Sequence, residues 1–168
     1  MSNGNDPSAI TSAIANAEDA FDQVGFGTPT FEAGIDSDED WTTQLTKAYQ
    51  VIDAARTIRS HNGHYTAIIE LCFGGIERSL EAWLLKETGD DLTDFNDHDY
   101  VYERVDQQAF FVDDTGRALR DLYRSNRNES YYAERVPTQE QADAMFELTR
   151  AVHDHIVGQV DDQGYCNC

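Results

Sequence analysis

The spacing of apolar residues constrains this chain most, because they recur every three or four positions over long stretches. The clearest stretch runs from His64 to Lys86 and places one stripe on a single helix face, formed by Ile69, Cys72, Phe73, Ile76, Leu80, Trp83 and Leu84. No stretch of useful length alternates with the period of two that a half-buried strand shows. The pattern therefore predicts an all-α protein, and 168 residues are enough to bury one core.

Two further helices are predicted before that segment. The first begins at Pro7 with Asp6 as its N-cap, and a linker rich in glycine, proline and acids follows it. The second begins near Asp38 and ends at a turn around Asn62 and Gly63, so it forms an antiparallel hairpin with the helix over 64–86. Gly74 and Gly75 inside that helix predict a close helix crossing, since each glycine otherwise costs about 1 kcal/mol relative to alanine.

Three helices are predicted in the second half of the chain. They cover 97–111, 113–128 and a last segment that starts after Pro137, where Thr138 and Gln141 form a capping box. Gly116 is expected to mark a kink or a break between the first two. The predicted organisation is a helix and acidic linker over 1–36, a helical bundle over 37–160 and a disordered tail over 161–168.

The charge composition is extreme. The formal net charge is -20, with 32 acidic residues against 12 cations, almost all of them arginines. Such an acidic, lysine-poor surface is typical of proteins from salt-accumulating archaea, where concentrated salt screens the repulsion within about 3 Å at 1 M. An acidic face for a cationic partner is the alternative. No signal peptide and no membrane-spanning stretch is evident, so a cytoplasmic location without membrane contact is predicted.

The cysteines and histidines predict no metal site and no cofactor. Three cysteines are an odd number, which argues against a disulfide framework; Cys72 is expected in the core, and Cys166 with Cys168 provides only two ligands. None of the five histidines follows a glutamate at a distance of three residues, which argues against a di-iron bundle.

Arginines are concentrated near the predicted fifth helix, where five of the twelve cations fall between residues 117 and 135. Four of them lie within an arc of about 80° on one helix face, namely Arg117, Arg120, Arg124 and Arg127. The opposite face is expected to pack inward through Ala118, Leu119, Leu122 and Tyr123. One interpretation is a solvated face with ion pairs to Asp113, Asp114 and Asp121. The other is a phosphate site formed by these arginines and Asn128, because the guanidinium group matches phosphate geometry.

Two acids on the helix over 64–86 allow two interpretations. Glu70 and Glu77 are seven residues apart and therefore lie on nearly the same face. The ordinary expectation is a pair of exposed acids. The alternative is a buried carboxylate that faces the arginines.

The run from Leu122 to Tyr132, followed by the capped last helix, resembles the C-terminal half of a HEPN domain. The preceding hairpin and the segment Asn96–Asp99 at a helix start fit the same family. The resemblance covers about residues 38–158. It implies an up-down helical bundle, here with an additional N-terminal helix, that forms a homodimer.

Catalytic HEPN proteins are metal-independent ribonucleases with an arginine, four to six further residues and then a histidine. Here Arg124 or Arg127 with Asn128 matches the first half, whereas Tyr131 or Tyr132 takes the place of the histidine. Tyrosine, with a pKa of about 10, is a poor general base at neutral pH.

The resemblance therefore implies a noncatalytic subunit that recognises RNA or a nucleotide, as the partner of a minimal nucleotidyltransferase. One alternative is a toxin-type ribonuclease that uses Arg127 with Tyr131 or Tyr132. Another alternative is a protein interaction module without a nucleic-acid role.

Overall fold

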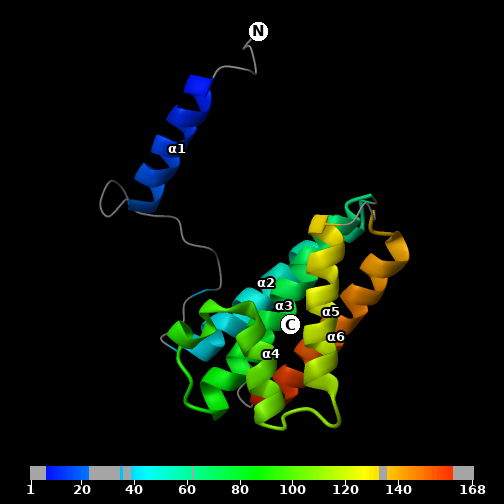
Figure 1. Cartoon of the computed structure of the whole chain (residues 1–168). Coiled ribbons are helices and arrows are strands. Elements are labelled where there is room, and N and C mark those ends of the chain that lie inside the picture. The colour runs from blue at the N-terminus through cyan, green and yellow to red at the C-terminus, as the bar shows by residue number, and fades with distance from the viewer. Residues whose placement is uncertain (1–6, 23–34, 36–38, 62, 133–135, 161–168) are drawn as a thin grey trace. The chain divides into compact units, whose positions relative to one another are not determined.

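The computed structural model describes residues 7–22, 35, 39–61, 63–132 and 136–160. The chain divides into two units, residues 1–32 and 33–168, and each is described by itself. The helices are α1 (Pro7–Asp22), α2 (Asp40–Arg59), α3 (Tyr65–Glu87), the 3₁₀ helix η1 (Leu92–Asn96), α4 (His98–Gln107), α5 (Thr115–Tyr132) and α6 (Gln139–Val160) (Figure 1). The described residues contain no strand, so the all-α prediction is confirmed.

The first unit contains α1, which begins at the predicted proline. Large apolar side chains on this helix are exposed, namely Ile10, Ile14 and Phe21. The predicted N-cap Asp6, most of the predicted linker and the predicted tail lie outside the described residues. The boundaries predicted for these parts stay a prediction.

The core of the second unit lies where α2, α3 and α6 pack side by side (Figure 1). The predicted stripe of α3 is buried, apart from a half-buried Trp83. The α2–α3 hairpin turns at Gly63, whose φ of 88° is in the left-handed region that glycine adopts without strain. Cys72 is fully buried, as predicted.

Gly75 lies where α3 passes close to both α2 and α6. A Cβ atom there would lie 3.0 Å from Ile52 Cγ1 of α2 and 3.0 Å from Thr149 Cγ2 of α6. Thr149 also donates a hydrogen bond of 3.3 Å from its hydroxyl to the Cys72 carbonyl oxygen of α3. The predicted close crossing is therefore confirmed at Gly75.

The predicted fourth helix is shorter in the structure. It ends at Gln107 rather than at Phe111, because the amides of Ala109 and Phe110 fold back to the carbonyl oxygens of Asp106 and Val105. Ala109 has a φ of 50°, so this is a Schellman motif with alanine where glycine is usual. Because no glycine stands at this position, no signal in the sequence marks the end of α4.

The fifth helix begins at Thr115 and runs to Tyr132, four residues beyond the predicted end. The break before it lies upstream of Gly116, which is in the first turn of α5. A Cβ atom on Gly116 would lie 3.2 Å from Asp106 Cβ, so this glycine permits close packing of α4 and α5.

The last helix follows the prediction. The backbone N–H of Gln141 donates to Thr138 Oγ1 at 3.2 Å, and the backbone N–H of Thr138 donates to Gln141 Oε1 at 2.9 Å. These two hydrogen bonds form the predicted capping box. Its buried face includes Ala142, Phe146, Thr149, Val152 and Ile156, which recur at helical spacing.

Candidate functional site

The buried side of α5 is narrower than predicted. Leu119 and Tyr123 are buried, but Ala118 is exposed and Leu122 is 40% exposed, so the inward packing predicted for these two is wrong. The reason is that α5 packs mainly against α4, along a line about 100° from the arginines rather than opposite them. The arginines therefore flank the α4–α5 contact.

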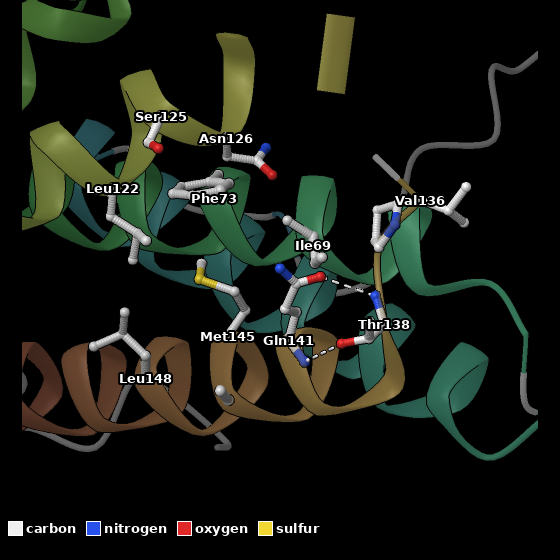
Figure 2. A pocket seen from close by; sticks show the side chains of 12 residues that line it. Ile69, Phe73, Leu122, Ser125, Asn126, Val136, Thr138, Gln141, Met145 and Leu148 are labelled. Atoms are coloured by element: carbon white, nitrogen blue, oxygen red, sulfur yellow. Dashed lines mark hydrogen bonds between the residues drawn. The ribbon is translucent and has the colours of Figure 1, made fainter. Parts of the chain in front are cut away.

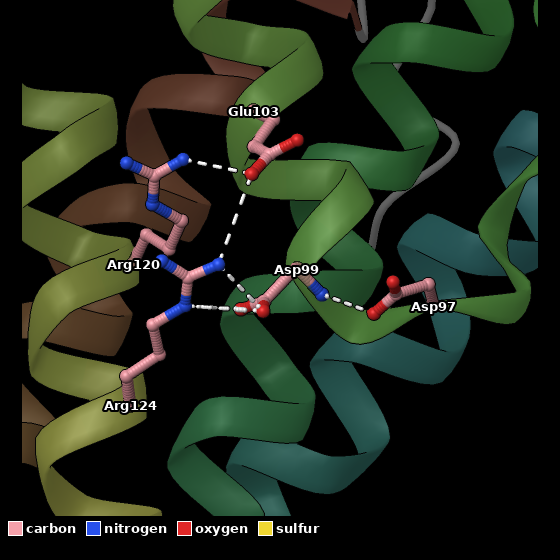
Figure 3. Close-up of polar contacts among 5 residues, drawn as sticks. All are labelled: Asp97, Asp99, Glu103, Arg120 and Arg124. Atoms are coloured by element: carbon pink, nitrogen blue, oxygen red, sulfur yellow. Dashed lines mark hydrogen bonds and ion pairs between the residues drawn. The ribbon is translucent and has the colours of Figure 1, made fainter.

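The arginines of α5 form ion pairs, mostly with carboxylates of α4 (Figure 3). Arg124 donates from Nε to Asp99 Oδ1 at 3.1 Å and from Nη2 to Asp99 Oδ2 at 2.8 Å, and Arg120 Nη1 lies 2.9 Å from Glu103 Oε1. Arg117 pairs with Asp114 at 3.3 Å on its own helix. The interpretation as a face of ion pairs is confirmed for Arg117 with Asp114, whereas the partners shown for Arg120 and Arg124 come from α4 and were not predicted.

The four arginines differ in their access to solvent. The side chain of Arg120 is 21% exposed and its Nε is buried without a hydrogen-bond partner in the described part of the chain. The side chain of Arg124 is 46% exposed and that of its partner Asp99 is 31% exposed. Arg117 and Asn128 are exposed. Phosphate binding by this set stays a prediction.

A buried polar cluster lies beneath the same face. Glu77 is 7% exposed, His98 Nδ1 lies 2.8 Å from its Oε2, and the Tyr102 hydroxyl donates to its Oε1 at 3.4 Å. The expectation of an exposed Glu77 is wrong, since α4 covers this part of α3, and the alternative of a buried carboxylate is confirmed. Glu70, half-buried, accepts a hydrogen bond of 3.3 Å from Asn126 Nδ2 of α5.

Tyr123 connects this cluster to the arginine face. Its hydroxyl accepts a hydrogen bond of 3.1 Å from Arg127 Nε, and the Arg127 guanidinium lies 5.3 Å from the centre of the Tyr123 ring. The His98 ring lies 5.9 Å from the same ring. His98 and Arg127 therefore both lie against the ring of Tyr123.

Burial perturbs the acidic groups of the cluster. Desolvation raises the pKa of Glu77, and the neighbouring His98 and Tyr102 partly offset that rise. Burial also raises the pKa of Tyr102 and of Tyr123. The side chain of His98 is 63% exposed, so a ligand in solution can reach its Nε2.

The contact between His98 and Glu77 was not predictable from the sequence. His98 lies in the segment Asn96–Asp99 at a helix start, and no sequence spacing relates it to Glu77 or Tyr123. The side chains of Tyr131 and Tyr132, which were candidates for the position of the family histidine, lie outside the described ones.

A groove lies between α3, α5 and α6, with a volume of about 470 Å³ (Figure 2). Its walls are mainly apolar, and the side chains of Ser125, Asn126, Thr138 and Gln141 add polar groups. None of the described residues that line it has a charged side chain.

The described residues meet neither the requirements of a metal site nor those of a membrane-spanning helix. Among the described residues, no three histidine, cysteine, aspartate or glutamate side chains are grouped closely enough to hold a metal ion. No helix in the described part of the chain is long and apolar enough to cross a membrane.

The fold and the site define an all-α domain with an ion-paired arginine face, a buried glutamate that pairs with an exposed histidine, and a groove whose described lining carries no charge. The chain belongs to the family described as "Domain of unknown function (DUF8154)", whose model matches residues 5–168. No curated protein and no solved structure matches the chain.

Proposed function

We propose that this domain is a noncatalytic HEPN-like module that recognises the phosphate of RNA or of a nucleotide through Arg124, Arg127 and Asn128. The proposal includes a homodimer and a minimal nucleotidyltransferase as partner, both of which follow from the resemblance alone. The observation that carries the phosphate site is the exposed, two-pronged contact between Arg124 and Asp99.

That contact presents a guanidinium group already oriented toward an oxyanion. The carboxylate of Asp99 has the same pair of acceptor oxygens that a phosphate offers, so it stands in for the proposed ligand. Exposed ion pairs contribute little to stability, so a phosphate group can replace Asp99 at small expense. By contrast, the Arg104–Asp90 pair has side chains only 23% and 10% exposed, which suits a structural role.

The test is RNA binding by the Arg124→Ala/Arg127→Ala variant, measured by fluorescence anisotropy with a short labelled single-stranded RNA. About 2 M KCl suppresses nonspecific attraction and screens the acidic surface. The matched control is Arg56→Ala/Arg150→Ala. These side chains are 48% and 47% exposed and also pair with nearby acids, so the control loses the same two charges elsewhere.

The expected result is saturable binding by the native protein and by the control, and its loss in the Arg124/Arg127 variant. An equal loss in both variants would show a general charge effect. Absence of binding by the native protein would refute the proposal and favour the interaction module without a nucleic-acid role.

The Glu77–His98 pair favours a second candidate, a metal-independent ribonuclease. In the tautomer whose Nδ1–H donates to Glu77, Nε2 of His98 is left as a base for the ribose 2′-hydroxyl. Nε2 would take the 2′-hydroxyl proton and the 2′-oxygen would attack phosphorus; the 5′-oxygen of the next nucleotide would leave with a proton from water or from the protonated imidazole, and a 2′,3′-cyclic phosphate would remain. Arg124 and Arg127 would stabilise the charge on the phosphate oxygens.

This candidate is tested by RNA cleavage in the presence of a chelator. Chelator-resistant cleavage that disappears in His98→Asn and falls in Glu77→Gln would replace the noncatalytic proposal. If His98→Asn cleaves as well as the native protein, this pair is not the catalytic group. RNA that the native protein binds but leaves intact supports the noncatalytic module.

A further inference from the structure

We infer that the groove between α3, α5 and α6 binds an uncharged heteroaromatic ring of the nucleobase class. The volume of the groove, its uncharged described lining and its hydrogen-bonding groups point to such a ring. The choice of a nucleobase among such rings rests on the proposed recognition of RNA or a nucleotide.

The groove has the size and the apolar surface of a ligand site. Its volume of about 470 Å³ is within the range of roughly 300–1,000 Å³ that small-molecule pockets occupy. Ile69, Phe73 and Met145 form a buried apolar floor, and Leu122, at 40% exposed, forms part of an open wall (Figure 2). A flat ring that enters this space exchanges water for apolar contact on its faces.

The described lining of the groove carries no charge. None of its 12 described residues is Asp, Glu, Lys or Arg, although charged residues make up 26% of the chain. A neutral group suits such a lining, because an ion without a partner is costly to bury. A phosphate group therefore fits the arginine face better than this groove.

Two side-chain amides give the groove a defined hydrogen-bonding pattern. Asn126 donates from Nδ2 to Glu70, and a flipped amide would point its oxygen at that carboxylate. Gln141 accepts at Oε1 from the Thr138 amide as part of the helix cap. Asn126 Oδ1 and Gln141 Nε2 therefore remain for a ligand, and neither has a hydrogen-bond partner among the described residues (Figure 2).

A nucleobase complements this pattern. Most base edges carry hydrogen-bond donors beside acceptors, and all bases have two apolar faces. Asn126 Oδ1 can accept from a ring or exocyclic N–H, while Gln141 Nε2 can donate to a ring nitrogen or carbonyl oxygen. The Ser125 hydroxyl lines the same wall and can bond to the sugar.

The test uses nucleosides, because they carry the base without phosphate. Adenosine, guanosine, cytidine and uridine are titrated against the full chain, and binding is followed by the NMR signal of the methyl group of Met145. The chain has only two methionines, so this signal is readily assigned. Isothermal titration in the same buffer gives the affinity.

Two variants and one control make the test specific. Gln141→Glu keeps the helix cap, since glutamate serves equally at that position, but replaces the donor by a carboxylate. Ala144→Trp fills the groove from an exposed position on α6 without changing the core. Gln159→Glu makes the same charge change at an exposed position of α6 away from the groove.

The expected result is that at least one nucleoside shifts the Met145 signal, and that its affinity falls about tenfold or more in Gln141→Glu and Ala144→Trp but not in Gln159→Glu. No binding by the native chain, or binding that Ala144→Trp leaves unchanged, would overturn the inference. Nucleoside binding without RNA binding would refute the phosphate proposal alone, and RNA binding without nucleoside binding would refute this inference alone.

Discussion

Two adjacent glycines of α3 should respond in opposite directions to the same substitution. Replacing either Gly74 or Gly75 by alanine raises the helix propensity, which favours the folded state by about 1 kcal/mol. At Gly75 the new Cβ would lie 3.0 Å from carbon atoms of both Ile52 and Thr149, well inside the ordinary contact distance of about 3.5–4.0 Å. Overpacking of this kind typically costs about 1–3 kcal/mol, so we expect Gly75→Ala to destabilise the domain by about 1 kcal/mol.

Gly74 provides the matched control because it is also a glycine inside α3, one residue before Gly75. Its new Cβ would approach only the end of the Arg78 side chain at 3.3 Å and Val51 Cγ1 at 3.9 Å. The long Arg78 side chain can move at little cost, so the gain in helix propensity outweighs the cost of this contact. Gly74→Ala should therefore stabilise the domain by about 0.5–1 kcal/mol.

The two variants are compared by urea unfolding, followed by circular dichroism at fixed pH and KCl concentration. The expected difference of about 2 kcal/mol corresponds to a separation of roughly 4–8 °C in a thermal melt. If Gly75→Ala stabilised the domain as much as Gly74→Ala, the three-helix crossing would be looser than the distances at Gly75 require, and the packing argument would be refuted.

Three other predictions concern the polar groups. Because burial raises the pKa of Glu77, the folded chain keeps a proton that the unfolded chain loses above a pH of about 4.3. The unfolding free energy of the native chain should therefore fall relative to that of Glu77→Gln as the pH rises from about 4.3 through the raised pKa, which urea titrations at several pH values would measure. Arg124→Ala should leave the urea midpoint nearly unchanged, whereas Arg104→Ala should lower it, since the second ion pair is more enclosed; equal shifts would contradict this. Burial raises the pKa of Cys72 to about 11, so iodoacetamide at pH 8 should label this thiol only after unfolding, as peptide mass spectrometry would show.

The helices of the core were predictable because their residues carry local information. The apolar stripe of α3, the capping box at Thr138 and Gln141, and the proline at the start of α1 each act within one or two helical turns. The end of α4 was missed for a local reason as well. Its Schellman motif has Ala109 in the left-handed conformation, and alanine carries no such signal in a sequence.

The inward face of α5 was mispredicted because α5 packs mainly against α4, along a line that leaves Ala118 and Leu122 exposed. An apolar residue on an amphipathic helix is usually buried, but Leu122 lies at the wall of a groove and is 40% exposed. The arginines were correctly grouped on one face by their spacing. Only the position of α4 decided that Asp99 and Glu103, rather than acids of the same helix, would bind the two central arginines.

The sequence by itself determined the all-helical class, the buried face of α3 and the grouping of the arginines, because these follow from helical periodicity. The tertiary structure alone decided that Glu77 is buried, that His98 binds it and that a groove with an uncharged described lining opens beside α5. Each of these features joins residues from different helices, which are brought together by the packing of α4 and α6 on α3 and of α5 on α4, and not by any spacing along the chain.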